Sequence, residues 1–169
     1  MKIQPISFKG MPNNYQKIDN YVSRSAQPTP EDFIWLKEQG ITDVVNFRTL
    51  LDPFITFDEK ATVEGLGMKY HHIPTYSRNP KEEDVEKFLS LTEKVTKENG
   101  KLHIHCKAGA DRTGLYAFIY KMKEGIGNIN SNIREWISRG HNQKLYPTMI
   151  KWGEDFVKKF PLKHPPIPL

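Results

Sequence analysis

The stretch over residues 101–120, KLHIHCKAGADRTGLYAFIY, decides how the rest of the chain is organised. A short apolar run ends at His105, and Cys106, the only cysteine of the chain, follows directly. Small residues then lead to Arg112, after which an apolar helical pattern begins. We predict a strand, a tight loop and a helix N-terminus, with a thiol at the start of the loop and a guanidinium at its end.

A loop of this kind can bind an oxyanion. Backbone N–H groups of a tight turn and of the first residues of a helix point into one concavity. Gly109 brings no Cβ to the rim, and Arg112 offers a two-pronged contact to phosphate oxygens. The same field favours the thiolate of Cys106, which predicts attack on phosphorus and a phosphocysteine intermediate. Residues 106–112 are called the phosphate loop (P-loop) below, and its predicted phosphate-binding residues are Lys107, Ala108, Gly109, Ala110, Asp111 and Arg112.

The segment HCKAGADRTG resembles the His-Cys-x5-Arg-Thr/Ser signature of cysteine-based protein tyrosine and dual-specificity phosphatases. The matching positions are His105, Cys106, Gly109, Arg112, Thr113 and Gly114. Segments 23–28 (SRSAQP) and 44–48 (VVNFR) are similar to small bacterial members of the dual-specificity type. The resemblance implies that Cys106 is the nucleophile and Arg112 the phosphate clamp. It further implies that Thr113 donates its hydroxyl to the sulfur, and that neither a metal nor another cofactor takes part.

The general acid is missing from the place where this class usually carries it. That loop precedes the long helix and here reads IPTYSRN over residues 73–79, without an acid. We predict Asp111 as the acid, because a carboxylate in an anion cradle must be protonated beside substrate or turned outward toward Lys107 or Arg78. Myotubularin-type lipid phosphatases resemble this chain in placing Asp before the arginine. The alternative acids are Asp52, Glu82, Glu83 and Asp84.

The substrate is less sharply defined than the reaction. We predict a tyrosine or dual-specificity protein phosphatase acting on phosphorylated protein. Lys107 resembles a basic residue of tensin-homologue phosphoinositide phosphatases, which makes a phosphoinositide or inositol phosphate the alternative substrate, although Ala110 stands where those enzymes have a second lysine. A rim lysine that attracts any phosphate explains Lys107 equally well. An inactive phosphate-binding module is the second alternative, because the loop aspartate is absent.

Two other chemistries compete for the same stretch. A metal site would use His103, His105 and Cys106 with His71 and His72, but this spacing supplies neither a carboxylate nor a place for a catalytic water. A sulfurtransferase would use the cysteine loop without needing the Arg-Thr pair. His105 is better explained as a strand-end residue that lies beneath the loop and tunes the thiolate.

Composition limits the remaining classes. The 169 residues suit one domain, with 37% hydrophobic and 27% charged residues and a net charge of +5. Dense Lys/Arg blocks are absent, so we expect no nucleic-acid partner, and no apolar run is long enough for a membrane span. The N-terminus does not read as a secretory signal. A single cysteine cannot form an internal disulfide, which favours the cytoplasm. The sequence leaves the oligomeric state open.

Alternating strand and helix patterns predict the α/β class. We expect a central, mostly parallel, four- to five-stranded sheet flanked by helices, as in protein tyrosine phosphatases of the dual-specificity type, with the site at the carboxyl ends of the strands. The single domain, residues 1–169, would carry a polar N-terminal arm (1–20) and a Pro-rich tail (161–169). Expected strands are 21–24, 41–47, 68–73 and 101–105, and expected helices are 29–40, 53–64, 80–99, 112–124, 130–139 and 147–160.

Several other residues are candidates for supporting roles. Arg24 and Arg48 would either support the phosphate loop or form ordinary salt bridges. Gln143, in a polar segment that begins at Arg139 and includes His141 and Asn142, resembles a water-orienting glutamine of some tyrosine phosphatases. The tryptophans at 35, 136 and 152 are predicted to lie in the core, since apolar residues flank them at helical spacing.

Overall fold

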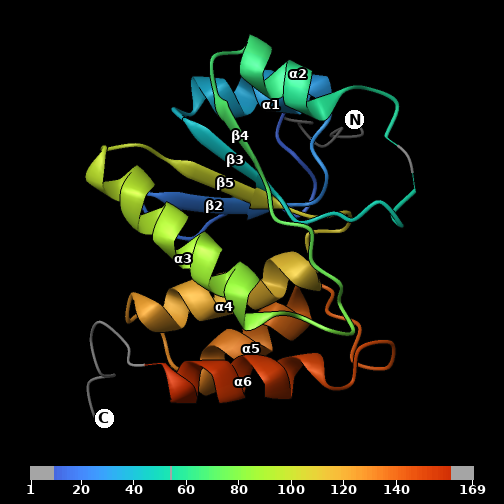
Figure 1. Cartoon of the computed structure of the whole chain (residues 1–169), viewed down its shortest axis with the longest axis vertical. Coiled ribbons are helices and arrows are strands. Elements are labelled where there is room, and N and C mark those ends of the chain that lie inside the picture. Colours follow the sequence, from blue (N-terminus) through green and yellow to red (C-terminus); the bar gives the residue numbers. More distant parts are fainter. Residues whose placement is uncertain (1–9, 54, 161–169) are drawn as a thin grey trace, which may run out of the picture.

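A mostly parallel sheet organises the chain (Figure 1). The computed structural model describes residues 10–53 and 55–160, and within them five strands pair in the order β1-β2-β5-β3-β4. Only the edge strand β1 (Gln16–Lys17) is antiparallel. The parallel strands are β2 (Val22–Ser25), β3 (Asp43–Asn46), β4 (Lys69–His72) and β5 (Leu102–His105). The predicted α/β class and sheet are confirmed.

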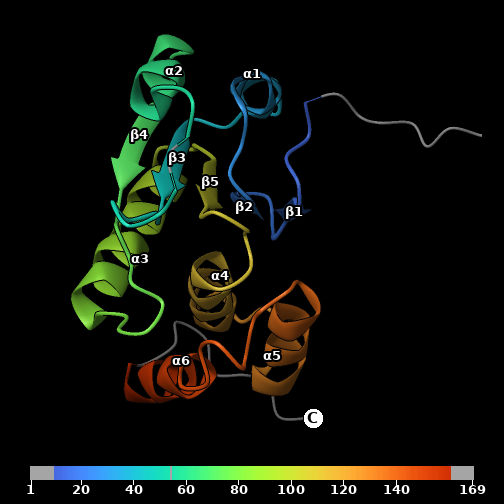
Figure 2. The same ribbon diagram turned by 90° about the vertical axis from the view of Figure 1, so that its right-hand side faces the viewer.

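Helices cover both faces of this sheet (Figures 1 and 2). One face carries α1 (Pro30–Glu38) and α2 (Glu59–Gly65). The other face carries a thicker layer formed by α3 (Glu82–Lys97), α4 (Arg112–Lys123), α5 (Ile129–Ser138) and α6 (Met149–Lys159). The loops that follow the parallel strands therefore gather at one end of the molecule, as expected for a parallel sheet.

The two layers are separated by the period-two alternation of the strands. In β3, Val44 packs with Phe33 and Leu36 beneath α1, whereas Val45 belongs to the larger core on the other side. In β5, Ile104 enters that larger core, so His103 and His105 face the α1 side. The strand that leads to Cys106 is thus apolar on one face and carries two buried imidazoles on the other.

Some boundaries differ from those predicted. Helix α2 begins at residue 59 rather than at the predicted residue 53 or 55, because the Asp58 side chain accepts a hydrogen bond from Ala61 N and caps the helix there. Residues 47–58 are therefore a long connection. In α1, Phe33 and Leu36 are fully buried, whereas the neighbouring apolar residue Ile34 is 48% exposed.

The structure describes part of the predicted N-terminal arm and none of the predicted C-terminal tail. The polar N-terminal arm contains the short strand β1. Residues 1–9 of that arm and the tail at 161–169 lie outside the described residues.

His103 is held in the neutral state by two serines of β2. The Ser25 hydroxyl donates to Ala26 O at 2.6 Å, so it accepts the Nε2–H of His103 at 2.7 Å. Nδ1 then accepts the hydroxyl of Ser23 at 2.8 Å. Burial, and to a smaller extent the charge of His105, holds the pKa of His103 well below its ordinary value.

This burial predicts a pH dependence of stability. Below about pH 6.5 the unfolded chain takes up a proton on His103 that the folded chain does not, so the free energy of unfolding should fall as the pH is lowered, by about 1.4 kcal/mol per pH unit. Urea unfolding of wild type and His103→Gln between pH 7.5 and 5.5 measures this contribution. The wild-type profile should be steeper than that of the variant, and parallel profiles would contradict the assignment.

Candidate active site

The phosphate loop joins the end of β5 to the start of α4. Cys106 is 2% exposed, and Arg112 is the first residue of the helix. The sheet order places β2 and β3 on either side of β5, so the segments after these strands flank the loop. The predicted strand, loop and helix are all present.

The carbonyl groups of the phosphate loop are bound from outside it. Their donors come from the N-terminal arm, from β2 and the segment after it, and from α5. Gln27 N binds Lys107 O at 3.0 Å, Asn14 Nδ2 binds Ala108 O and Gly109 O at 3.2 Å each, Arg24 Nη2 binds Gly109 O at 2.7 Å, and Trp136 Nε1 binds Ala110 O at 3.0 Å. No hydrogen bond joins the amides of residues 107–112 to any described residue. These N–H groups are therefore free to bind an oxyanion.

Two glycines make this packing possible. Gly109 has φ of +67°, and a Cβ there would lie 2.5 Å from Ala26 N and from the carbonyl carbon of Ser25. A Cβ on Gly114 would lie 2.0 Å from Nε1 of Trp136, the atom that binds the loop. Both positions of the signature therefore need glycine for steric reasons.

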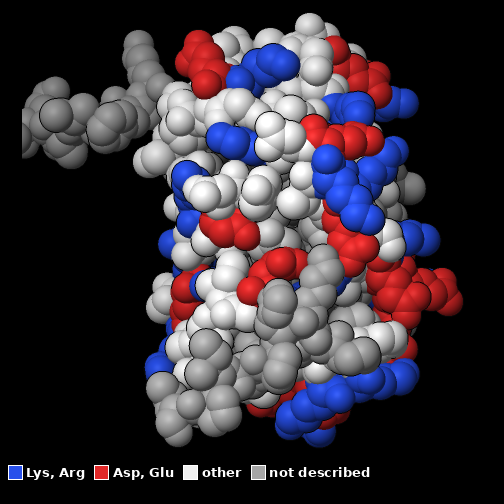
Figure 3. All heavy atoms as spheres, turned by 90° about the vertical axis from the view of Figure 1, so that its left-hand side faces the viewer, with Lys and Arg blue, Asp and Glu red and all other residues white. Residues whose placement is uncertain are grey.

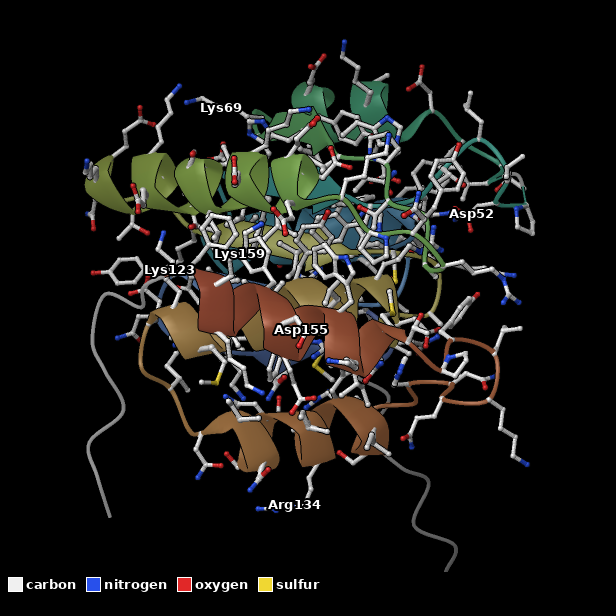
Figure 4. The ribbon with its side chains drawn as sticks, turned by 60° about the horizontal axis from the view of Figure 1, so that its bottom comes forward. Asp52, Lys69, Lys123, Arg134, Asp155 and Lys159 are labelled. Carbon is white, nitrogen blue, oxygen red and sulfur yellow. The ribbon has the colours of Figure 1, made fainter. Side chains whose placement is uncertain are left out.

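Arg112 is engaged by a carboxylate from the β3–α2 connection. Nη1 of Arg112 lies 2.6 Å from Asp52 Oδ2, and Nη2 lies 2.9 Å from Oδ1. Burial raises the pKa of Asp52, but the bonds from Arg112 and from Thr49 N outweigh it and lower the pKa to about 2. Burial lowers the pKa of Arg112, but Asp52 and the nearby Cys106 outweigh it and raise the pKa. Figure 4 shows Asp52 on this connection, at the end of the molecule away from Lys69 and Lys123.

Asp111 binds the segment between α5 and α6. Its Oδ1 accepts a hydrogen bond from Asn142 N at 2.8 Å and lies 2.7 Å from His141 Nδ1. Asp111 pairs with neither Lys107 nor Arg78, the two partners predicted for a carboxylate that turns outward. Oδ2 has no bond to a described residue, so one oxygen is fixed and the other remains available. The role of Asp111 as an acid stays a prediction.

A buried polar network joins the end of β5, directly before the phosphate loop, to α2 and to the segment after β2. His105 Nε2 lies 2.6 Å from Glu59 Oε1, and Glu59 Oε2 accepts from Gln27 Nε2 at 2.8 Å. Burial raises the pKa of Glu59, but the charge and hydrogen bond of His105 outweigh it and lower the pKa. Arg24 is also buried; burial and the charge of Arg139 lower its pKa to about 10, so it stays protonated at neutral pH.

The other predicted residues are placed as follows. The buried Thr113 hydroxyl has no hydrogen-bond partner among the described residues, the Cys106 sulfur included, so its predicted hydrogen bond to that sulfur stays a prediction. Lys107 and Gln143 are exposed. Glu82 on α3 pairs with Lys159 on α6, and Asp84 pairs with Lys87 within α3, so neither carboxylate pairs with a residue of the phosphate loop. Trp136 lies in the core, as predicted, while Trp35 and Trp152 pack at its edge.

The imidazoles proposed for a metal site have other partners. Both ring nitrogens of His103 bind serines, His71 binds Asp43 at 2.8 Å, and His105 binds Glu59. Within the described residues no group of three or more His, Cys, Asp or Glu is arranged to hold a metal ion.

A hollow of about 270 Å³ lies beside the loop. Its walls come from the connections that follow β3, β4 and α5, and it is lined by Thr49, Leu51, Asp52, Thr75, Tyr76, Ser77, Arg78, Arg112 and Tyr146. The guanidinium of Arg78 lies 5.6 Å from the centre of the Tyr146 ring, a cation–π contact across the hollow. The hollow therefore offers one guanidinium bound by Asp52 and a second one on an aromatic ring.

Sequence reasoning missed four residues that shape the site: Asn14, Gln27, Glu59 and Trp136. The long N-terminal segment gave no signal for Asn14, although its φ of +54° in the structure marks a special turn. Trp136 lies in the core, as predicted. Its indole N–H needs a hydrogen-bond partner when buried, and this requirement could have indicated a contact with a backbone carbonyl. Arg24 binds the loop directly, whereas Arg48 binds Gln27 Oε1 at 2.8 Å.

Comparison with known proteins agrees with this geometry. Residues 4–148 match the family model described as DSP-PTPase phosphatase fused to NAD+ kinase. Among curated proteins none matches the chain. A DUF442 protein from Shewanella putrefaciens CN-32, described as a phosphatase candidate, has 25% identity and a TM-score of 0.76, with 95% of this chain and 99% of that chain covered.

Two further solved structures share the fold at lower identity. TpbA of P. aeruginosa has 19% identity and a TM-score of 0.70, over 87% of this chain and 90% of that chain. The core catalytic domain of the PP-IP phosphatase SIW14 from S. cerevisiae has 18% identity and a TM-score of 0.69, over 91% of this chain and 98% of that chain.

The fold and the phosphate loop define a cysteine-dependent phosphatase of the protein-tyrosine-phosphatase-like class. Because the family match spans most of its length, the chain belongs to the DSP-PTPase phosphatase family described as fused to NAD+ kinase. None of the described helices is long and apolar enough to cross a membrane.

The contacts of Gly109 predict a severe effect of one added methyl group. Gly109→Ala would force a Cβ against backbone atoms at 2.5 Å and a positive φ on alanine, so the loop must shift. We expect a loss of about 2 kcal/mol in the free energy of unfolding and at least a hundredfold loss in kcat/KM. Urea unfolding and steady-state kinetics measure both. Gly65→Ala, whose Cβ meets nothing within 4 Å, is the matched control.

Proposed function

We propose that this protein hydrolyses phosphomonoesters by double displacement through a phosphocysteine at Cys106, and that its substrate is tyrosine-phosphorylated protein. The observation that supports the proposal is the phosphate loop itself, which combines amides without a partner among the described residues, a 2%-exposed thiol and, at its end, the guanidinium of Arg112. We infer a reducing compartment, the cytoplasm, because the reaction needs a free thiol.

In the first step the thiolate of Cys106 attacks phosphorus. An S–P bond forms, the P–O bond to the leaving group breaks, and the leaving oxygen takes a proton from Asp111. The loop amides and Arg112 stabilise the charge on the equatorial oxygens. In the second step water attacks phosphorus, gives a proton to the Asp111 carboxylate and releases inorganic phosphate. Thr113 donates a hydrogen bond to the departing sulfur.

Two observations support an aryl phosphate as substrate. The sulfur lies below the surface, so a substrate must project its phosphate inward, and a tyrosine ring places phosphate further from the peptide backbone than a serine does. The aromatic residues Tyr76 and Tyr146 line the hollow beside Arg112 and can contact such a ring. The exposed Lys107 supports the alternative of a phosphoinositide or an inositol phosphate.

Turnover by the purified protein tests the reaction. Wild type should hydrolyse an aryl phosphate with vanadate sensitivity, and Cys106→Ser should lose at least a thousandfold in kcat, because the hydroxyl is a poor nucleophile at neutral pH. A panel of phosphotyrosine and phosphoserine peptides, phosphoinositides, inositol phosphates and NADP+ then ranks the substrates; NADP+ is included because the family model is described as fused to NAD+ kinase.

Two outcomes would contradict the proposal. Full activity of Cys106→Ser would exclude the phosphocysteine. Binding of phosphorylated ligands by wild type without any turnover would instead identify an inactive phosphate-binding module.

The leaving group tests Asp111 as the acid. Asp111→Asn cannot donate a proton, so kcat/KM, which reports the step that forms the phosphocysteine, should fall about a hundredfold or more for an alkyl phosphate or phenyl phosphate. For an activated aryl phosphate with an acidic phenol kcat/KM should fall much less, because that leaving group needs no proton. Steady-state kinetics on the two esters measure the ratio. Asn142→Ala keeps the carboxyl and serves as the control. Equal losses on both esters would contradict the role of Asp111.

A further inference from the structure

We propose that Asp52 is a positioning residue for Arg112: it holds the guanidinium by the edge formed by Nη1 and Nη2, so that the adjacent edge formed by Nε and Nη2 is presented to phosphate. This inference rests on the proposed function and deepens it, since it assigns a role to the β3–α2 connection in forming the phosphate site. Asp52 lies 60 residues before Arg112 in the chain, and both side chains are largely buried, at 14% and 11% exposure.

The geometry of the pair leaves room for phosphate. A guanidinium has five N–H donors, and Asp52 uses one on Nη1 and one on Nη2. The Nε–H and the remaining Nη2–H form a second two-pronged edge, which matches a pair of phosphate oxygens. Asp52 and phosphate can therefore bind Arg112 at the same time, on different edges.

Asp52 is itself fixed at both the side chain and the backbone. Its Oδ2 accepts from Thr49 N at 2.6 Å and from the Thr49 hydroxyl at 3.3 Å, which closes a turn at residues 49–52. The next residue, Pro53, accepts a hydrogen bond at its carbonyl from Nη2 of Arg48. A carboxylate anchored in this way can set the rotamer of the arginine, whose free side chain has many.

The anchor extends to the other end of the phosphate loop. Arg48 Nη1 binds Gln27 Oε1 at 2.8 Å, Gln27 Nε2 binds Glu59 Oε2 at 2.8 Å, and Glu59 Oε1 lies 2.6 Å from His105 Nε2. His105 directly precedes Cys106. The β3–α2 connection thus links the residue before the nucleophile to the clamp at the end of the loop, so their relative placement depends on it.

The Asp52–Arg112 pair differs from an ordinary surface ion pair in its burial and in its additional hydrogen bonds. Lys151 and Asp155 on α6 form such a pair, exposed at 77% and 57%, with no further anchor described. Pairs of that kind contribute little. Figure 4 shows Asp155 on α6, well away from Asp52. Asp155→Asn is therefore the matched control for Asp52→Asn.

Binding measured without turnover tests the proposal. In the Cys106→Ser background, calorimetry with tungstate should give about tenfold or greater weakening for Asp52→Asn and Asp52→Ala, partial recovery for Asp52→Glu, and no change for Asp155→Asn. In active protein, Asp52→Asn should lower kcat/KM equally for esters with good and poor leaving groups. In an Arg112→Lys background, Asp52→Asn should add little, because lysine has no planar fork to orient.

Each other result overturns the proposal. Tighter tungstate binding in Asp52→Asn would show that Asp52 competes with phosphate for Arg112. A loss confined to poor leaving groups would make Asp52 the general acid. Unchanged binding and kinetics would reduce the pair to a structural contact. Since tungstate binding needs no catalysis, a failure of the proposed phosphatase reaction would leave this test valid, and turnover with unchanged binding would reject Asp52 alone.

Discussion

The backbone amides of residues 107–112 must remain unpaired within the protein if the phosphate loop is to bind an oxyanion. Amides without a partner in the protein add no internal hydrogen bond, each typically worth about 1 kcal/mol of stability, so such a loop is not stable by itself. The structure offsets this by binding the loop carbonyls from outside, with Asn14, Gln27, Arg24 and Trp136 as donors. The fold therefore has to bring these four donors, which lie far from the loop in the sequence, to its carbonyl groups.

The sheet order provides that arrangement. With β2 and β3 on either side of β5, the segment after β2 supplies Gln27, and the connection after β3 supplies Asp52. The larger helical layer supplies Trp136 and His141. At the side on the left of Figure 1, the visible Lys and Arg side chains are interspersed with Asp and Glu, so the basic excess forms no single patch there (Figure 3).

The structure separates the two carboxylates that flank Arg112. Asp111 binds the α5–α6 segment through one oxygen, whereas Asp52 binds the guanidinium through both. Their surroundings therefore suit them to different roles. Asp52, which binds Arg112 and has a pKa of about 2, stays ionised at neutral pH. The loop at 73–79, where an acid is usual, instead brings Tyr76 and Arg78 to the hollow.

The sequence alone determined the strand, the phosphate loop and the helix around Cys106, because periodicity, caps and glycine positions are local properties. It also determined the α/β class, since strand and helix patterns alternate along the chain. Only the tertiary structure decided that Asp52 binds Arg112, that Asp111 binds His141, and that Gly114 makes room for Trp136. These contacts join residues far apart in the chain, and which distant loops meet depends on the order of strands in the sheet, which no local pattern encodes.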